Sequence, residues 1–361
     1  FEDANKVLTK TNLFVNRCMT FMMPSMMLIM NGISVLIVYN GSYAVDAGNM
    51  QVGDMMAFIQ YAMQIIMAFL MITAMSIMLP RANVAAMRIV EILETENSLK
   101  EPEAPVHPSE EIKGTVEFDH VSFAYPDAGE NVLTDISFKA EKGQTLAVIG
   151  STGSGKSSLI NLIPRFYDVT QGCVKVDGVD VRSMSQKELR DRLGYVPQKG
   201  VLFSGTIDSN IRYGKTDISE EQVKKAAMVA QAQDFIEEKP HGYESPVAQG
   251  GTNVSGGQKQ RLSIARAVAK DPEIFIFDDS FSALDFKTDK ALRKALKEHT
   301  KNATTIIVAQ RISTILNADQ ILVLDDGKMA GLGTHRELMK NCEVYRQIAM
   351  SQLSEEELAN E

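Results

Sequence analysis

Residues 145–157 read TLAVIGSTGSGKS, an apolar segment followed by a glycine-rich one. Its first part, Thr145–Ile149, is apolar and rich in β-branched residues, which predicts a short buried strand. Its second part, Gly150–Ser157, fits the phosphate-binding pattern Gly-x-x-x-x-Gly-Lys-Ser. Helical sequence follows from Ser158, so the pattern lies between a strand and a helix, where backbone amides attract phosphate groups. The stretch therefore predicts an α/β domain that binds a nucleotide.

The loop divides its expected tasks between backbone and side chains. Its glycines allow the backbone to wrap closely around phosphates. Lys156 is expected to reach the β- and γ-phosphates, and the Ser157 hydroxyl is expected to bind Mg²⁺. The residues expected to hold the nucleotide in this loop are Gly150, Ser151, Thr152, Gly153, Ser154, Gly155, Lys156, Ser157 and Ser158.

A second stretch, residues 274–285 (IFIFDDSFSALD), places two acids at the end of an apolar run. Ile274–Phe277 predicts a buried strand, and Asp278 and Asp279 follow it directly. Acids at the C-terminal end of a strand are well placed for a metal ion or a reacting water. Whether the two acids form a working catalytic pair is left open by these residues alone.

Residues 113–350 alternate short β-rich segments with helical stretches, which predicts a largely parallel sheet covered by helices. The expected strands include Val116–Phe118, Thr145–Ile149, Ile274–Phe277, Thr304–Ala309 and Ile321–Leu324. Residues 97–112 are rich in proline and charge and predict a linker. Residues 351–361 are expected to be a C-terminal tail.

The N-terminal part has a different character. Neither Cys18–Val45 nor Met55–Leu79 contains a charged residue, and each exceeds the roughly 20 apolar residues that cross a bilayer. We expect spans at about 18–39 and 55–79, within residues 1–96 as the C-terminal part of a transmembrane domain. The alternative is a pair of buried core helices.

Charges around these runs indicate an orientation. Basic residues flank the outer ends, whereas the connector Tyr39–Asp54 has none. The positive-inside bias places both outer ends in the cytoplasm and the connector outside. The flanking bases are Lys6, Lys10, Arg17, Arg81 and Arg88.

Overall composition excludes some partners and sites. The net charge of −9 argues against a nucleic-acid partner, because polyanion binders usually carry a basic face. The three cysteines lie far apart and have no metal-ligand spacing. Because the sequence opens at Phe1 rather than Met, we expect it to be the C-terminal portion of a longer protein.

Further motifs occur in a definite order along the chain. They are FAYP with Tyr125, YVPQ with Gln198, NVSGGQKQR at Asn253–Arg261, and SALD at Ser282–Asp285. With the phosphate loop they resemble the nucleotide-binding domain of an ATP-binding cassette (ABC) transporter, from about Lys113 to Met350. The hairpin resembles the last two spanning helices of an ABC exporter half-transporter. The expected fold is thus an α/β P-loop NTPase domain of the ABC ATPase type, preceded by an α-helical transmembrane hairpin.

The resemblance implies ATP and Mg²⁺ as cofactors, and it implies roles for matching residues. Tyr125 would stack on adenine, although the alternative is a core tyrosine. Gln198 would sense Mg²⁺ and the γ-phosphate, and Asp278 would hold Mg²⁺ together with Ser157.

The signature segment is implied to serve a second cassette. Ser255, Gly256 and Gly257 would open a helix that faces the partner's ATP, so that two domains sandwich two nucleotides. We count Gln258 and Asp285 among the nucleotide-contacting residues as well. A helix cap with a tight turn is the structural reading of Ser255-Gly-Gly, and both readings can hold at once.

Two positions depart from the family pattern in one site. Efficient members carry Glu where this chain has Asp279, which is shorter by one C–C bond, about 1.5 Å. They carry His where this chain has Gln310, and an amide cannot become cationic. Gln249 and Gly250 likewise replace the family's usual Glu-Arg pair. The candidate catalytic residues are Asp279, Gln310 and Lys156.

These departures predict an asymmetric ATPase. This chain's own site would bind ATP and turn over slowly, while its signature completes a competent site on a different half-transporter that carries the usual Glu and His. The expected location is the plasma membrane, with the nucleotide-binding domain in the cytoplasm. The alternatives are a homodimeric exporter with a working Asp279, a soluble ABC ATPase acting on DNA or the ribosome, and a cassette that only regulates.

Overall fold

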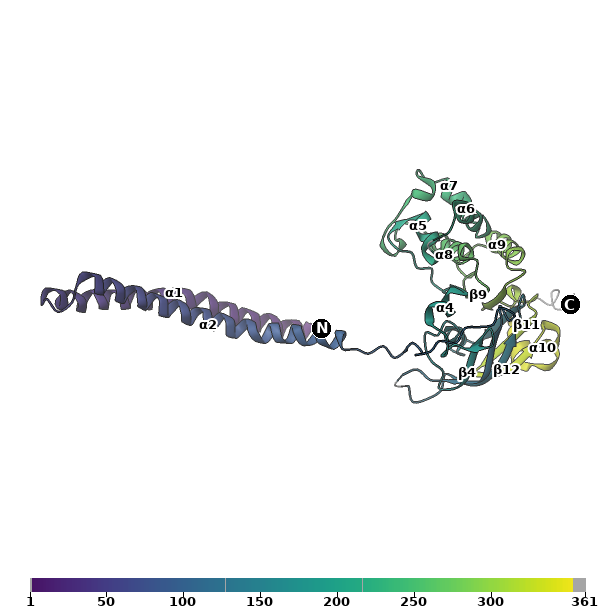
Figure 1. The fold of residues 1–361 in the computed structure, drawn as a ribbon, viewed down its shortest axis with the longest axis horizontal. Coiled ribbons are helices and arrows are strands. Elements are labelled where there is room, and N and C mark those ends of the chain that lie inside the picture. Colours follow the sequence, from purple (N-terminus) through teal and green to yellow (C-terminus); the bar gives the residue numbers. More distant parts are fainter. Residues whose placement is uncertain (1, 127, 216, 353–361) are drawn as a thin grey trace. The chain divides into compact units, whose positions relative to one another are not determined.

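The computed structural model describes residues 2–126, 128–215 and 217–352. The chain divides into two compact units, the first ending at Asn97 and the second beginning at Ser98 (Figure 1). Most of the expected C-terminal tail, residues 353–361, lies outside the described residues.

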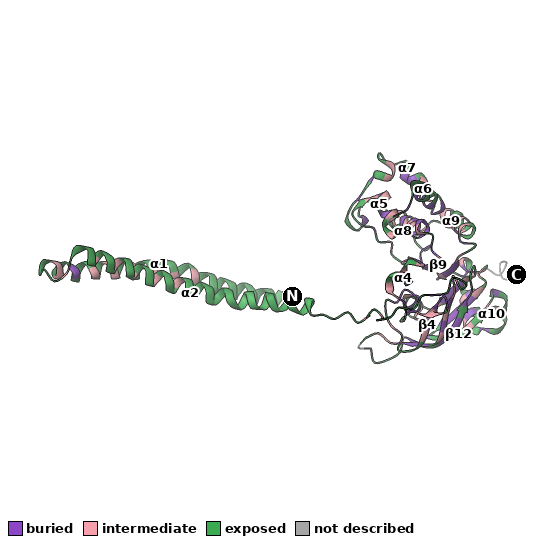
Figure 2. Ribbon diagram, viewed as in Figure 1, coloured by how far each residue is buried: buried purple, intermediate pink, exposed green. Residues whose placement is uncertain are grey.

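The first unit is a hairpin of two long helices, α1 (Glu2–Asp46) and α2 (Val52–Leu93), which run side by side (Figure 1). Both are long and apolar enough to cross a membrane, and none of the residues in their most apolar windows is buried. Most residues along the hairpin are exposed (Figure 2), including most of its large apolar residues, which is the opposite of what buried core helices require. The connector is shorter than the Tyr39–Asp54 expected, because α1 continues through Asp46 and only residues 47–51 turn the chain.

The second unit is built on a six-stranded sheet with the order β12-β11-β3-β10-β9-β6. All neighbouring strands are parallel except the edge pair β11 and β12. This arrangement confirms the largely parallel sheet expected from the alternating sequence. The strands are β3 (Thr145–Gly150), β6 (Leu193–Val196), β9 (Ile274–Asp278), β10 (Thr304–Val308), β11 (Gln320–Asp325) and β12 (Lys328–Gly333).

A second, antiparallel sheet contains β1, and here the single-sheet expectation was wrong. Its order is β2-β1-β4-β5, with β1 (Val116–Phe123), β2 (Leu133–Ala140), β4 (Gln171–Val176) and β5 (Val179–Asp180). The nine residues between β1 and β2 are too few for a crossover helix, so the two strands pair antiparallel. Phe118 and Phe138 stack across this pair with ring centroids 4.5 Å apart, in a core shared with the larger sheet.

Helices complete the second unit around two further apolar cores. One core joins α5, α6, α7 and α8 to strands β6 and β9, and the other joins α10 and α11 to β3 and β11. The helices are α3 (Lys156–Leu162), α4 (Gln186–Asp191), α5 (Ile207–Ile211), α6 (Glu220–Val229), α7 (Gln233–Glu237), α8 (Gly256–Lys270), α9 (Phe286–His299), α10 (His335–Asn341) and α11 (Glu343–Gln352). Short 3₁₀ turns lie at Arg212–Gly214, Gly242–Glu244, Gln249–Gly251 and Ile312–Thr314, and β7 (Gly205–Thr206) pairs with β8 (Pro246–Val247).

Candidate nucleotide site

The phosphate loop connects β3 to α3, as the sequence predicts, and its glycines are sterically required. A Cβ on Gly150 would lie 2.2 Å from the carbonyl oxygen of Leu324, on the neighbouring strand β11. Gly153 and Gly155 have φ angles of 85° and 93°, in the left-handed region that favours glycine. Glycine at position 150 thus avoids a clash, and glycines at positions 153 and 155 permit a left-handed backbone that other residues rarely adopt.

Lys156 lies at the centre of this loop. Its ammonium Nζ donates to the carbonyl oxygens of Gly150 at 2.9 Å and Ser151 at 2.7 Å, and to Ser154 Oγ at 3.4 Å. Burial lowers the pKa of Lys156, and the carboxylates of Asp278 and Asp279 oppose that shift. The Lys156 ammonium, surrounded by hydrogen-bond acceptors, thus lies where the phosphates of a nucleotide are expected.

Four parallel strands end at one edge of the large sheet, and the predicted site residues follow those ends. Gly150 ends β3 and Asp278 ends β9, whereas Gln198 and Gln310 come just after β6 and β10. This edge is where ligands bind in open α/β sheets. The topology therefore gathers residues from four separate segments of the chain.

Asp278 connects this edge to the phosphate loop. Its Oδ1 accepts a hydrogen bond of 3.2 Å from the Ser157 hydroxyl, and the residue is only 6% exposed. Burial raises the pKa of Asp278, and the Ser157 hydroxyl partly offsets that effect. The pair presents two hard oxygen atoms from different elements, which is the donor chemistry that Mg²⁺ prefers. The residues present therefore fit Mg²⁺, which Ser157 and Asp278 would hold beside a bound nucleotide.

The Asp279 carboxylate is hydrogen-bonded to two other predicted site residues. Its Oδ2 accepts from Gln310 Nε2 at 2.7 Å and from Gln198 Nε2 at 3.3 Å. The residue is 8% exposed and has a φ angle of 45°, and its backbone N–H donates to the carbonyl oxygen of Val308. The left-handed backbone is uncommon for a residue other than glycine and is enriched at functional sites. The structure thus brings Gln198, Asp279 and Gln310 into one hydrogen-bonded cluster.

Tyr125 lies beside the phosphate loop and is half-buried. Its hydroxyl is hydrogen-bonded to Ser158 Oγ at 2.9 Å, and its ring packs edge-on against Phe123 and Tyr167. These contacts place the tyrosine next to the loop while also tying it to the core. Its stacking on adenine stays a prediction.

The signature segment caps α8, as its structural reading predicts. Ser255 Oγ accepts from the Gln258 backbone N–H, and the Gln258 carboxamide accepts from the Ser255 backbone N–H. A Cβ on Gly257 would lie 3.3 Å from the carbonyl oxygen of Ala283, whereas Gly256 faces open space. Ser255 and Gly256 are exposed, so the cap is compatible with a ligand that comes from outside this chain.

Asp285 has a structural task as well. Its carboxylate caps α9 by accepting from the Thr288 backbone N–H at 3.0 Å. That hydrogen bond lowers the pKa of Asp285. Contact of Asp285 with a nucleotide stays a prediction.

Sequence reasoning missed a residue that holds Gln198 in place. Gln260 of α8 is 2% exposed, and its carboxamide donates to the carbonyl oxygen of Pro197 and accepts from the backbone N–H of Gly200. These two bonds bracket Gln198 and join its loop to the signature helix. The available signal was its position inside the NVSGGQKQR motif.

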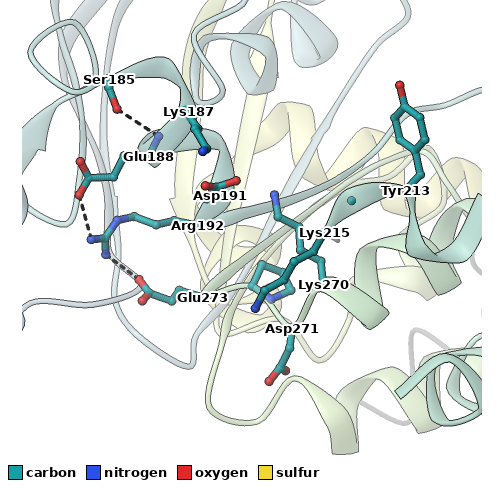
Figure 3. Close-up of a pocket in the computed structure, with 12 residues that line it drawn as sticks. Ser185, Lys187, Glu188, Asp191, Arg192, Tyr213, Lys215, Lys270, Asp271 and Glu273 are labelled. Carbon is teal, nitrogen blue, oxygen red and sulfur yellow. Dashed lines mark hydrogen bonds and ion pairs between the residues drawn. The ribbon is translucent and has the colours of Figure 1, made fainter. Parts of the chain in front are cut away.

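A separate hollow of about 910 Å³ lies away from this cluster (Figure 3). It is found where β6 and β9 begin rather than where they end, and none of the predicted site residues lines it. Arg192 bridges Glu188 and Glu273 there, at 3.4 Å and 3.1 Å. The predicted nucleotide residues lie at the opposite edge of the sheet, where β3, β6, β9 and β10 end, so we assign the nucleotide chemistry to that edge.

Comparisons with known proteins identify relatives of this chain. Residues 133–282 match the family model described as ABC transporter. An uncharacterized ABC transporter ATP-binding protein of Mycobacterium tuberculosis is 45% identical over 98% of this chain and 61% of its own length. Mouse ATP-binding cassette sub-family B member 6 is 38% identical over 85% of this chain and 36% of its own length.

A solved structure is similar as well. A bacterial Atm1-family ABC exporter with ATP bound superposes with a TM-score of 0.76 and 34% sequence identity, over 91% of this chain and 57% of that one. The chain therefore spans about 61% of the length of the first curated relatives it matches.

Proposed function

The chain carries the ATP-binding domain of an ABC transporter, and on that premise we propose that it is one half of a heterodimeric ABC exporter. Its own nucleotide site binds ATP and hydrolyses it slowly. Its signature segment completes the hydrolytic site of a partner half-transporter. The observation that carries this proposal is the Asp279 carboxylate, held between the side-chain amides of Gln198 and Gln310.

The cluster around Asp279 is poorly suited to fast hydrolysis. An aspartate falls about 1.5 Å short of a glutamate at the same backbone position. A misplacement of about 1 Å can cost roughly 10²-fold in rate, which is comparable to the contribution of a general base. Gln310 remains neutral, so it stabilises developing phosphate charge less than a protonated histidine would.

The phosphate-binding half of the same site keeps the features that ATP binding needs. Lys156 supplies a cation within the loop, and Ser157 with Asp278 supplies oxygen donors for Mg²⁺. Mg²⁺, when bound, would neutralise charge between the β- and γ-phosphates. An intact phosphate loop beside altered catalytic residues is expected to bind ATP without hydrolysing it rapidly.

The membrane role rests on the helical hairpin and on the relatives. We propose that α1 and α2 span the plasma membrane, with the ATP-binding domain in the cytoplasm. Binding of ATP would bring the two cassettes together, and hydrolysis at the partner's site would separate them. This cycle would switch the membrane domains between two access states. The solved neighbour, which its description calls an exporter, supports the direction of transport.

The test is to measure the ATPase rate of the purified protein alone and together with a half-transporter that carries Glu and His at the two altered positions. We expect low activity alone and high activity for the pair. Full activity of this protein alone, as a homodimer, would overturn the asymmetric arrangement. Release from membranes by salt wash without detergent would instead favour a soluble ABC ATPase.

A further inference from the structure

The backbone around Gln310 is hydrogen-bonded to the side chain of Gln352, at the C-terminal end of the domain. Gln352 ends α11, and its Nε2 donates to the Gln310 carbonyl oxygen at 2.9 Å. Its Oε1 accepts from the Ile312 backbone N–H, also at 2.9 Å. One carboxamide thus bonds the backbone on both sides of Arg311, although 42 residues separate it from Gln310.

The helix that presents Gln352 is firmly anchored. Tyr345, Ala349 and Gln352 are spaced at i, i+4 and i+7, so they share one face of α11. Tyr345 and Ala349 are both 0% exposed in the core formed with β3 and β11, and the Tyr345 hydroxyl is hydrogen-bonded to His335 at 2.6 Å. Gln352 therefore contacts the Gln310 segment from a helix that is packed firmly against the core.

Fixing the backbone at residues 310 and 312 also fixes the direction of the Gln310 side chain. That side chain reaches Asp279 with a hydrogen bond of 2.7 Å, and Asp279 adjoins Asp278 at the phosphate-loop edge. We propose that Gln352 is a positioning residue that orients Gln310, and through it Asp279, toward the γ-phosphate end of bound ATP. This inference rests on the proposed ATP site.

A second contact holds the same segment farther along. Arg293 of α9 donates to the carbonyl oxygen of Ser313 at 3.1 Å and pairs with Asp289 at 2.6 Å. Neither of these bonds involves the backbone of residue 310 or 312. Arg293 therefore holds the backbone at Ser313, whereas Gln352 holds the backbone of Gln310, whose side chain faces the site.

The chemistry of a carboxamide matters at this position. It donates and accepts at once, and the two backbone groups it meets are one acceptor and one donor. A glutamate could still accept from Ile312, but it would place a second acceptor against the Gln310 carbonyl oxygen. Gln352→Glu should therefore disturb the segment at least as much as Gln352→Ala.

The test compares a nucleotide that has a γ-phosphate with one that lacks it. In the full detergent-solubilised protein, ATPγS and ADP would compete with an azido-ATP photolabel that cross-links to this chain. We expect Gln352→Ala to weaken ATPγS competition by about three- to tenfold, the effect of losing one or two hydrogen bonds. ADP competition should stay within about twofold. Gln347→Ala is the matched control, because Gln347 is on the same helix and, among the described residues, its side chain is hydrogen-bonded to Glu343 at the surface.

A double-variant comparison separates positioning from general destabilisation. If Gln352 acts through Gln310, then adding Gln352→Ala to Gln310→Ala should have no further effect on ATPγS competition. Equal weakening of ATPγS and ADP by Gln352→Ala, or no change in either, would overturn the inference while leaving the ATP site intact. Photolabelling that Lys156→Ala leaves unchanged would instead count against the ATP site itself.

Discussion

The carboxylate edge around Asp279 and the start of α8 around Ser255 contrast within one domain. At the edge, Asp279 and Gln310 depart from the family pattern, and their side chains are hydrogen-bonded to each other. At the start of α8, the Ser-Gly-Gly-Gln core is kept, Ser255 and Gly256 are exposed, and a Cβ on Gly256 would meet no described atom within 4 Å. Under the proposed function, two catalytic residues of this chain's own nucleotide site have diverged, whereas the signature core that would serve a partner has not. The contrast indicates that catalysis and completion of a neighbouring site can be altered separately.

The largest expected effect comes from blocking the signature turn. Gly257→Asp would place a carboxylate in the first turn of α8, where the backbone of Ala283 already lies close. A negative charge there would repel a partner's phosphates and prevent the sandwich. We expect the ATPase rate of the purified pair to fall by about 10²-fold or more, comparable to losing an oxyanion donor.

Gly242→Asp provides the control for this change. It adds the same charge in the 3₁₀ turn Gly242–Glu244, where a Cβ meets open space and the φ of 49° is one that aspartate adopts more readily than most residues. Its ATPase rate should match that of the unmodified pair. If Gly257→Asp also leaves the rate unchanged, the signature of this chain does not complete a working site, and the contrast disappears.

A smaller effect is expected from removing the cation of the phosphate loop. Lys156→Ala eliminates charge-assisted hydrogen bonds to two phosphates, so ATP binding to this chain should weaken on the order of 10- to 100-fold. Photolabelling of this chain with azido-ATP measures the change. Lys187→Ala is the control, because Lys187 lines the separate hollow of Figure 3. Equal labelling of both variants would contradict the assignment of Gly150–Ser157 as the binding loop.

The sequence was sufficient for those parts of the site that local pattern controls. TLAVIGSTGSGKS gave the strand, the loop and the helix in order, and IFIFDD placed the acids at a strand end. Gln198 and Gln310 were identified by the resemblance to the ABC family rather than by local pattern, and the structure places both side chains against Asp279. The hairpin followed from two uncharged runs of sufficient length.

The rest depended on contacts between distant segments, which no local pattern reports. The direction of β1 is set by its pairing with β2 and β4, not by its composition. The helix ends of the hairpin extend beyond the apolar runs, because charged residues also continue a helix once it has formed. Gln260 and Gln352 act through backbone groups on other elements, so only the folded chain shows what each one holds.

The smallest expected effect is also the most informative about the contrast. Asp279→Asn keeps the size of the side chain and removes the charge that a general base needs. A working base contributes about 10²–10⁴-fold, but a site that is already slow should lose little, so we expect the ATPase rate of the pair to change by less than about twofold. Asp271→Asn, an exposed change at the end of α8, is the control. A loss as complete as that of Gly257→Asp would mean that Asp279 is a working base. This chain's own nucleotide site and its signature segment would then contribute equally to ATP hydrolysis, as in a homodimer.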